Sequence, residues 1–332
     1  MSRIVDHTMA ETECIFCNKK SPQIVIEEEG YQCRKCLSCD LIYISNKPLP
    51  EEIERLYNEV QANRSADASI SGFFSKRLHA RHHLRIIRKF IKNGSLLEIG
   101  PGDGSFLYEA REEGFEVGGI ELNNTQANFI KNRLGIACEE SPLDASSFGG
   151  KNFDIIYHRD VISHFYDPIG EFQKMNGRLK DKGFLIFETG NLGNVDEKYY
   201  RLFTSFQLPD HLFFFGEKSL KELLRRTGFE FVTAYRYSKA PLLWIMKSFK
   251  TKTDQFTVRG GKKHLRDSGQ PSKKTESFVF QHLLRNAFNF LSYFMLYGIG
   301  YVVPKKGRPQ SLFVIARKKH TSPVGLERTS VS

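Results

Sequence analysis

The pattern of apolar and polar positions changes near residue 95. Beyond that point, short and nearly continuous apolar runs alternate with amphipathic stretches of helical period, which predicts alternating strands and helices. The expected strands are 96–99, 115–121, 135–138, 153–157, 183–188, 229–237 and 312–316, and the expected helices are 105–113, 125–134, 169–179 and 219–227. Apolar strands separated by helices predict an α/β fold whose parallel sheet is covered on both faces.

A different organisation precedes residue 95. Pro48 and Pro50 introduce a short expected helix over 51–59, and a polar stretch over 61–72 follows it. Apolar side chains then recur among basic ones, which predicts a basic amphipathic helix over 74–91.

Three glycines, Gly100, Gly102 and Gly104, stand between the strand at 96–99 and the next helix. Glycine lets the backbone turn tightly and approach a ligand, and a helix N-terminus presents free N–H groups. Such a loop alone is weak evidence, because dinucleotide enzymes use a similar one. Glu98 lies within the strand, where it can receive an ammonium group. Glu121 ends the following strand, where a carboxylate can accept hydrogen bonds from ribose hydroxyls.

Five of the six cysteines lie within residues 14–39. They are Cys14, Cys17, Cys33, Cys36 and Cys39. The first two form one C-x-x-C pair, and the other three offer two overlapping second pairs. Either combination has the spacing of a structural four-cysteine zinc site, in which four thiolates leave no open position for catalysis.

The residue after each pair favours one combination. Asn18 and Asp40 tolerate the left-handed backbone that such a turn requires, and Leu37 suits it less well. The predicted ligands of a structural zinc ion are Cys14, Cys17, Cys36 and Cys39. Cys33 is then a spare thiol, although which of the last three cysteines is the non-ligand stays open.

The net charge of +11 is concentrated near the C-terminus. Residues 251–275 carry seven Lys or Arg against two Asp, and residues 304–332 carry seven against one Glu. Residues 1–250 are therefore neutral overall. A neutral body offers no basic groove beside a catalytic site, which argues against nucleic acid as a partner.

Residues 278–303 form an apolar segment between the two basic stretches. Gln281, Arg285, Asn289 and Ser292 recur at helical spacing and give one polar stripe. Arg285, Asn286 and Asn289 argue against a helix that spans a bilayer. Two interpretations stay open: peripheral contact with a membrane surface, and packing on the domain or in a dimer interface.

Several motifs in order resemble the class I S-adenosylmethionine (SAM)-dependent methyltransferases. Residues 96–121 resemble the first two motifs of that family, 153–157 the motif of its fourth strand, and 158–168 the loop after that strand. The resemblance spans 80–237 and the final strand, and it implies a Rossmann-like sheet of seven strands. Ser163 stands where relatives often have Glu, so no role attached to that Glu is carried over.

The stretch from Cys36 to Tyr57 also resembles a zinc ribbon that precedes methyltransferase domains, including those of bacterial sugar C-methyltransferases. The expected organisation is a zinc ribbon over 1–48, a helical linker over 49–92, a SAM-binding core over 93–239, a basic and amphipathic insert over 240–310, and the last strand with a basic tail over 311–332.

The resemblance implies which residues bind SAM. Glu98 and the three loop glycines would hold the methionine part, and Glu121 the ribose. The stretch 141–144, with Leu143 within it, would flank the adenine. His158 is also expected at the cofactor.

Transfer of a methyl group to oxygen or carbon usually requires removal of a proton from the acceptor. Histidine suits this role because its pKa lies near neutral pH. His164 follows the fourth strand, and His211 lies in a stretch that resembles the family's "HxxxF" segment. Both are candidate catalytic residues, and a packed structural histidine is the alternative for each.

We therefore expect a SAM-dependent methyltransferase that acts on a small-molecule or glycan-precursor acceptor. A nucleotide- or lipid-linked sugar in polysaccharide biosynthesis is favoured by resemblance alone. An RNA methyltransferase and a non-catalytic zinc- and SAM-binding module are the alternatives. The first residues lack the apolar core of an export signal, so a cytoplasmic location is expected, with peripheral contact at the inner membrane surface left open.

Overall fold

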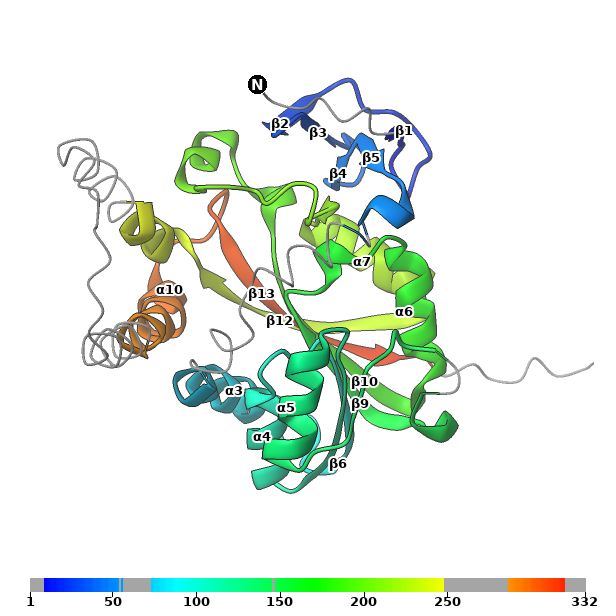
Figure 1. The fold of residues 1–332 in the computed structure, drawn as a ribbon. Coiled ribbons are helices and arrows are strands. Elements are labelled where there is room, and N and C mark those ends of the chain that lie inside the picture. Colours follow the sequence, from blue (N-terminus) through cyan, green and yellow to red (C-terminus); the bar gives the residue numbers. More distant parts are fainter. Residues whose placement is uncertain (1–8, 54, 56–72, 145–146, 248–285, 320–332) are drawn as a thin grey trace, which may run out of the picture.

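A mixed sheet of seven strands forms the centre of the protein (Figure 1). The structure, a computed structural model, describes residues 9–53, 55, 73–144, 147–247 and 286–319. The strand order is β12-β13-β10-β9-β6-β7-β8. These strands are β6 (Gly94–Ile99), β7 (Phe115–Ile120), β8 (Cys138–Glu139), β9 (Phe153–Arg159), β10 (Leu179–Gly190), β12 (Phe229–Ser238) and β13 (Gln310–Lys318). The α/β prediction and the seven-stranded Rossmann-like sheet are confirmed.

The sheet is not wholly parallel, which corrects the prediction. Strand β13 runs antiparallel to both of its neighbours, β10 and β12. The reason lies in the insert before it: the chain leaves the sheet at Ser238 and returns beside it at Gln310, and these two residues face each other. The last strand therefore begins where β12 ends and must run in the opposite direction.

Helices cover both faces of the sheet. On one face lie α3 (Phe73–Ile87), α4 (Ser105–Glu112) and α5 (Asn124–Leu134), and on the other lie α6 (Pro168–Gly177) and α7 (Glu217–Arg226). Successive strand residues enter opposite clusters: Leu96 and Ile155 pack with the first group, and Leu97 and Ile156 with the second. The alternation explains why the strands are apolar almost throughout.

The N-terminal region forms two small sheets. Strand β1 (Met9–Glu11) pairs with β5 (Asn46–Pro48). Strands β2 (Ile24–Glu28), β3 (Tyr31–Lys35) and β4 (Ile42–Ile44) form an antiparallel sheet that a fourth strand, β11 (Phe213–Phe214), completes. Because β11 comes from the core region, residues 9–48, here called the ribbon, share a sheet with the core.

Two parts of the insert belong to the described residues. Residues 240–247 are helical, 248–285 lie outside the described residues, and 286–302 form a second helical segment. The latter includes a π-helical stretch, η5 (Phe294–Ile299), and ends in α10 (Gly300–Val302). No helix in the described parts of the chain has the length and apolar character needed to cross a membrane.

One face of 286–302 is buried against the domain, as one of the two interpretations predicts. Its buried side chains include Met295, Leu296 and Tyr297. Asn289, from the predicted polar stripe, donates a hydrogen bond to Ser75 Oγ of α3 at 2.7 Å. Asn289 of the stripe therefore contacts the domain, while Ser292 donates its hydroxyl to the carbonyl oxygen of Asn289 within the same helical segment. The other members of the stripe, Gln281 and Arg285, lie outside the described residues.

Short 3-10 turns connect the larger elements. They are η1 (Ser147–Gly150), η2 (Ile162–His164), η3 (Leu192–Asn194) and η4 (Glu197–Leu202). A helix was expected over 51–59. Residues 50–53 are helical, and most of 54–59 lies outside the described residues.

Candidate functional site

The loop between β6 and α4 adopts the left-handed backbone at each of its glycines. The φ angle is 68° at Gly100, 59° at Gly102 and 71° at Gly104, a region that residues with a Cβ rarely adopt. A Cβ at Gly104 would lie 2.8 Å from the side chain of Ile130, and one at Gly100 would lie 2.9 Å from Val161. A Cβ at Gly102 would have no heavy atom of the described residues within 4 Å beyond its chain neighbours, so the middle of the loop is open to a ligand.

A cavity of about 130 Å³ lies beside this loop, and we call it the loop cavity. Gly100 and Gly102 form part of its wall. Its charged lining residues are Lys76, Glu98, Asp103 and Arg159. The cavity therefore offers both signs of charge to a ligand, at the carboxyl end of parallel strands where α/β sheets bind ligands.

Glu98 is the most unusual group in the loop cavity. Its side chain is 4% exposed, and its Oε2 has no hydrogen-bond partner among the described residues. Burial, with a further contribution from Asp103, raises the pKa of the Glu98 carboxyl well above its usual range. A buried carboxylate oxygen without a partner is costly, so this site fits a cationic donor such as an ammonium group.

The sequence analysis missed several polar residues of the loop cavity, among them Lys76, His83 and Arg159. Lys76 and His83 come from α3, and Arg159 ends β9. The Nζ of Lys76 lies 2.8 Å from Asp103 Oδ2, and the Nε of Arg159 lies 3.5 Å from Glu188 Oε2. No local motif marks Lys76 or His83, because only the packing of α3 on α4 brings them to the glycine loop.

Glu121 supports the loop from the neighbouring strand. Its Oε2 accepts a hydrogen bond from the N–H of Gly102, and its Oε1 accepts one from the N–H of Asn123, both at 2.9 Å. Burial raises the pKa of its carboxyl. Leu143 is buried in the cluster on the α6 side of the sheet. Neither residue lines the loop cavity, so their expected contacts with a ribose and an adenine stay predictions.

The structure places His158 away from the loop cavity. Its ring is buried and stacks on Phe187, with 5.0 Å between ring centroids. Burial lowers the pKa of His158 to about 3, so the ring is neutral. The cause is strand parity: Tyr157 and Arg159 face the loop cavity, and the residue between them faces the opposite side of the sheet. Its side chain does not support the expected cofactor role.

A second and larger cavity, of about 420 Å³, contains both candidate catalytic histidines, and we call it the histidine pocket. The ring centroids of His164 and His211 lie 4.7 Å apart. Aromatic side chains and polar groups line the pocket together. They include Phe203, Phe206, Phe214, Asp160, Asn191, Gln207 and Lys239. Arg159, the last residue of β9, lines the loop cavity, and Asp160, the next residue, lines the histidine pocket, so both cavities include residues at the end of this strand.

The two histidines differ in their electrostatic surroundings. The Nδ1 of His211 lies 2.9 Å from the carbonyl oxygen of Phe206, so Nδ1 carries the hydrogen and Nε2 the lone pair. Burial lowers the pKa of His211, and His164 lowers it further. Burial alone would also lower the pKa of His164, but Asp210, whose Oδ1 lies 3.1 Å from Nδ1, raises it. Such opposed shifts are typical of acid–base pairs.

The four predicted zinc ligands lie together at one end of the ribbon. The Sγ atoms of Cys14 and Cys39 are 3.5 Å apart, and those of Cys17 and Cys36 are 3.7 Å apart. A tetrahedral zinc ion with Zn–S bonds of about 2.3 Å places its sulfur ligands about 3.8 Å apart. The donor set and its spacing therefore fit zinc.

The backbone at the cysteine cluster agrees with the choice of ligands. Asn18 and Asp40 have φ angles of 52° and 62°, the left-handed conformation expected for them. Cys33 is buried apart from the pairs, and burial raises the pKa of its thiol to about 12.

Comparison with known proteins gives one match to a family model. Residues 74–234 match the model described as "Methyltransferase domain". No curated protein matches the chain.

Among solved structures, a protein from Galdieria sulphuraria that is proposed to be a sarcosine dimethylglycine methyltransferase is 13% identical, with a TM-score of 0.45 over 74% of this chain and 85% of that one. Coclaurine N-methyltransferase, bound to N-methylheliamine and SAH, is 12% identical, with a TM-score of 0.43 over 72% of each chain. The mycolic acid cyclopropane synthase CmaA1 is 14% identical, with a TM-score of 0.42 over 68% of this chain and 78% of that one. Similarity at this level transfers no activity.

Proposed function

We propose that the chain transfers the methyl group of SAM to a small-molecule or glycan-precursor acceptor, with a nucleotide- or lipid-linked sugar favoured. The match of residues 74–234 to the methyltransferase-domain model supports this proposal. The observation that carries the proposal is the buried carboxylate of Glu98 in the loop cavity, whose Oε2 has no partner among the described residues, beside three glycines in the left-handed conformation. When bound, SAM supplies an electrophilic methyl group on a sulfonium.

The residues of the loop cavity fit the amino-acid end of SAM. Glu98 would accept hydrogen bonds from its ammonium group, which would satisfy the orphaned Oε2. Lys76 and Arg159 line the same cavity and would attract its carboxylate. Glu121 would bind the ribose hydroxyls, and Leu143 would flank the adenine.

The histidine pocket would hold the acceptor. Its aromatic faces can stack on the C–H faces of a sugar, and its amide, carboxylate and lysine side chains can bind hydroxyl groups. His211 would take the proton from the reacting hydroxyl at Nε2, since its Nδ1 is held by Phe206. His164, whose pKa is raised, would donate a hydrogen bond to the acceptor.

The cysteine cluster would hold a structural zinc ion. Cys14, Cys17, Cys36 and Cys39 would be its four ligands, which fits the sulfur separations of 3.5 and 3.7 Å. The proposed role is to fold the ribbon.

A peripheral membrane contact is a second proposal, carried by the outer face of 286–302. Phe290, Phe294 and Tyr301 are 61%, 54% and 62% exposed. Lys305 and Lys306 follow the helical segment after Val303 and Pro304. Exposed aromatic residues beside lysines suit the surface of an anionic bilayer, which would bring the enzyme to a lipid-linked acceptor.

The acceptor class is tested by product formation. Zinc-loaded protein is incubated with SAM and with nucleotide-linked sugars, lipid-linked sugars or structured RNA, and release of S-adenosylhomocysteine is measured. We expect release with a sugar acceptor, and its loss in the His211→Asn variant. Release with RNA and with no sugar would contradict the acceptor class while leaving SAM use intact.

A further inference from the structure

The ribbon is joined to the segment 205–215, which carries the proposed base and much of the histidine pocket. Strand β11 of this segment pairs with β4 of the ribbon, with Phe213 opposite Tyr43. The N–H of Ile44 donates a hydrogen bond to the carbonyl oxygen of Leu212 at 3.0 Å. One strand of the segment is therefore built into the ribbon's own sheet.

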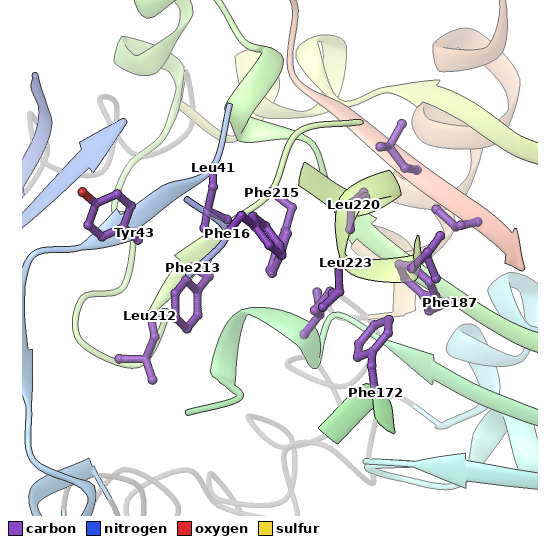
Figure 2. Close-up of a cluster of buried hydrophobic side chains, with 14 of the residues drawn as sticks. Phe16, Leu41, Tyr43, Phe172, Phe187, Leu212, Phe213, Phe215, Leu220 and Leu223 are labelled. Carbon is purple, nitrogen blue, oxygen red and sulfur yellow. The ribbon is translucent and has the colours of Figure 1, made fainter. Parts of the chain in front are cut away.

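Apolar packing joins the same two parts. One continuous hydrophobic cluster runs from the ribbon through this segment to the helices on the sheet (Figure 2). Figure 2 labels members from the ribbon (Phe16, Leu41 and Tyr43), from the segment (Leu212, Phe213 and Phe215) and from the core (Phe172, Phe187, Leu220 and Leu223). The segment is thus packed between the ribbon and the core.

A single carboxylate of the ribbon holds the backbone just before the proposed base. Glu28 ends β2, at a hairpin whose turn residues Glu29 and Gly30 have φ angles of 53° and 86°. Its carboxylate accepts hydrogen bonds from the N–H groups of Phe206, at 3.1 Å, and Leu208, at 3.0 Å. Burial would raise the pKa of the Glu28 carboxyl, but these N–H donors outweigh burial and the pKa is lowered.

The residue that Glu28 binds also orients the proposed base. Phe206 donates its N–H to Glu28, and its carbonyl oxygen accepts the Nδ1 hydrogen of His211 at 2.9 Å. The N–H of His211 is itself bonded to the carbonyl oxygen of Gln207 at 3.0 Å. A shift of Phe206 therefore moves the ring that presents Nε2 to the pocket.

From these contacts we propose that the ribbon is a structural part of the acceptor site, and that Glu28 is a positioning residue that fixes the orientation of His211. The inference rests on the proposed function, since it assigns His211 the role of base. The proposed zinc ion would then have a second role. By folding the ribbon, it would hold Glu28 and β4 in place against segment 205–215.

The test compares two isosteric variants on the same strand. Glu28→Gln removes the charge and replaces one acceptor oxygen by an NH₂ group, which cannot accept from a backbone N–H. Glu27→Gln is the matched control, because Glu27 is exposed and bonds only the Gln32 side chain among the described contacts. We expect Glu28→Gln to lower kcat by about 10- to 100-fold, the usual effect of a small misplacement of a reacting group. SAM affinity and zinc content should match those of the control.

The second readout does not require turnover. The ring titration of His211 is followed by NMR in zinc-loaded protein. Its midpoint lies below 6.5 in the wild type because the ring is buried, and in Glu28→Gln it should rise toward 6.5 as the loosened loop admits water. The charged neighbours His164, Asp210 and Asp160 are unchanged in both variants, so their effects cancel in the comparison.

The outcomes separate the two claims. Identical kcat and identical ring titration in Glu28→Gln and Glu27→Gln would overturn the positioning role. Full turnover in His211→Asn would refute the assignment of His211 as the base. The titration of the His211 ring in Glu28→Gln would still test whether Glu28 positions that ring. If Glu28→Gln does not fold, the shorter carboxylate of Glu28→Asp takes its place, with the same expected directions and the same opposing result.

Discussion

Replacing Glu98 by Gln should have opposite effects on cofactor binding and on the stability of the cofactor-free protein. Gln keeps the shape of the side chain and removes its charge. A hydrogen bond to a charged partner contributes about 1.5–3 kcal/mol, so losing the charge should weaken SAM binding by about 10- to 150-fold. The Oε2 of Glu98 has no partner among the described residues, so the variant breaks no bond at that atom in the cofactor-free protein.

The stability effect follows from the raised pKa of Glu98. A carboxyl whose folded pKa is raised costs stability above its unfolded pKa of about 4.3, because the folded state resists its ionisation. The neutral variant removes that cost at pH 7 and has no advantage near pH 4. A relief of about 1 kcal/mol corresponds to a rise in Tm of about 2–4 °C.

Calorimetry measures the SAM affinity, and thermal unfolding without SAM measures Tm. Glu109→Gln is the matched control: Glu109 is equally buried, but it pairs with Arg77 and Arg81. That variant should lower Tm and leave SAM binding unchanged. An unchanged SAM affinity in Glu98→Gln, or a lower Tm at pH 7, would refute the reasoning.

Three further outcomes follow from the account. His211→Asn should lower kcat by about 10²- to 10⁴-fold with unchanged SAM affinity. The wild-type rate should rise with pH through a midpoint below 6.5, because burial lowers the pKa of His211. A rate that does not change with pH over that range would contradict the role of His211 as base. Cys36→Ser should lose zinc and stability, while Cys33→Ser should keep one zinc per chain by elemental analysis, and loss of zinc from Cys33→Ser would contradict the ligand assignment. Phe294→Ser should weaken sedimentation with anionic liposomes, and wild-type protein that stays in solution would end the membrane proposal.

The fold was predictable from the sequence because its strongest local signals come from burial. Strands buried on both faces are apolar almost throughout, and all seven strands were expected near their observed positions. The direction of β13 was not predictable in this way, since an apolar run carries no information on strand direction. Only the return of the chain beside Ser238 fixes it.

The candidate site was predictable where a backbone conformation restricts the residue type. The three loop glycines, Asn18 and Asp40 all adopt positive φ angles, and glycine and asparagine-like residues are enriched there for steric reasons. His158 shows the limit of motif reasoning: it lies in the resembling loop, but the alternation of β9 turns its side chain away from the loop cavity. Lys76 and Glu28 have no local signal, because each acts across a contact between distant segments.

The central claim is that the site beside the glycine loop binds SAM. The most direct measurement is calorimetric titration of the zinc-loaded wild-type chain with SAM, with S-adenosylhomocysteine and NAD titrated separately, since a glycine loop of this kind also occurs in dinucleotide enzymes. The account predicts saturable binding of SAM and S-adenosylhomocysteine at one site per chain, and no binding of NAD. No binding of SAM, or tighter binding of NAD, would contradict it.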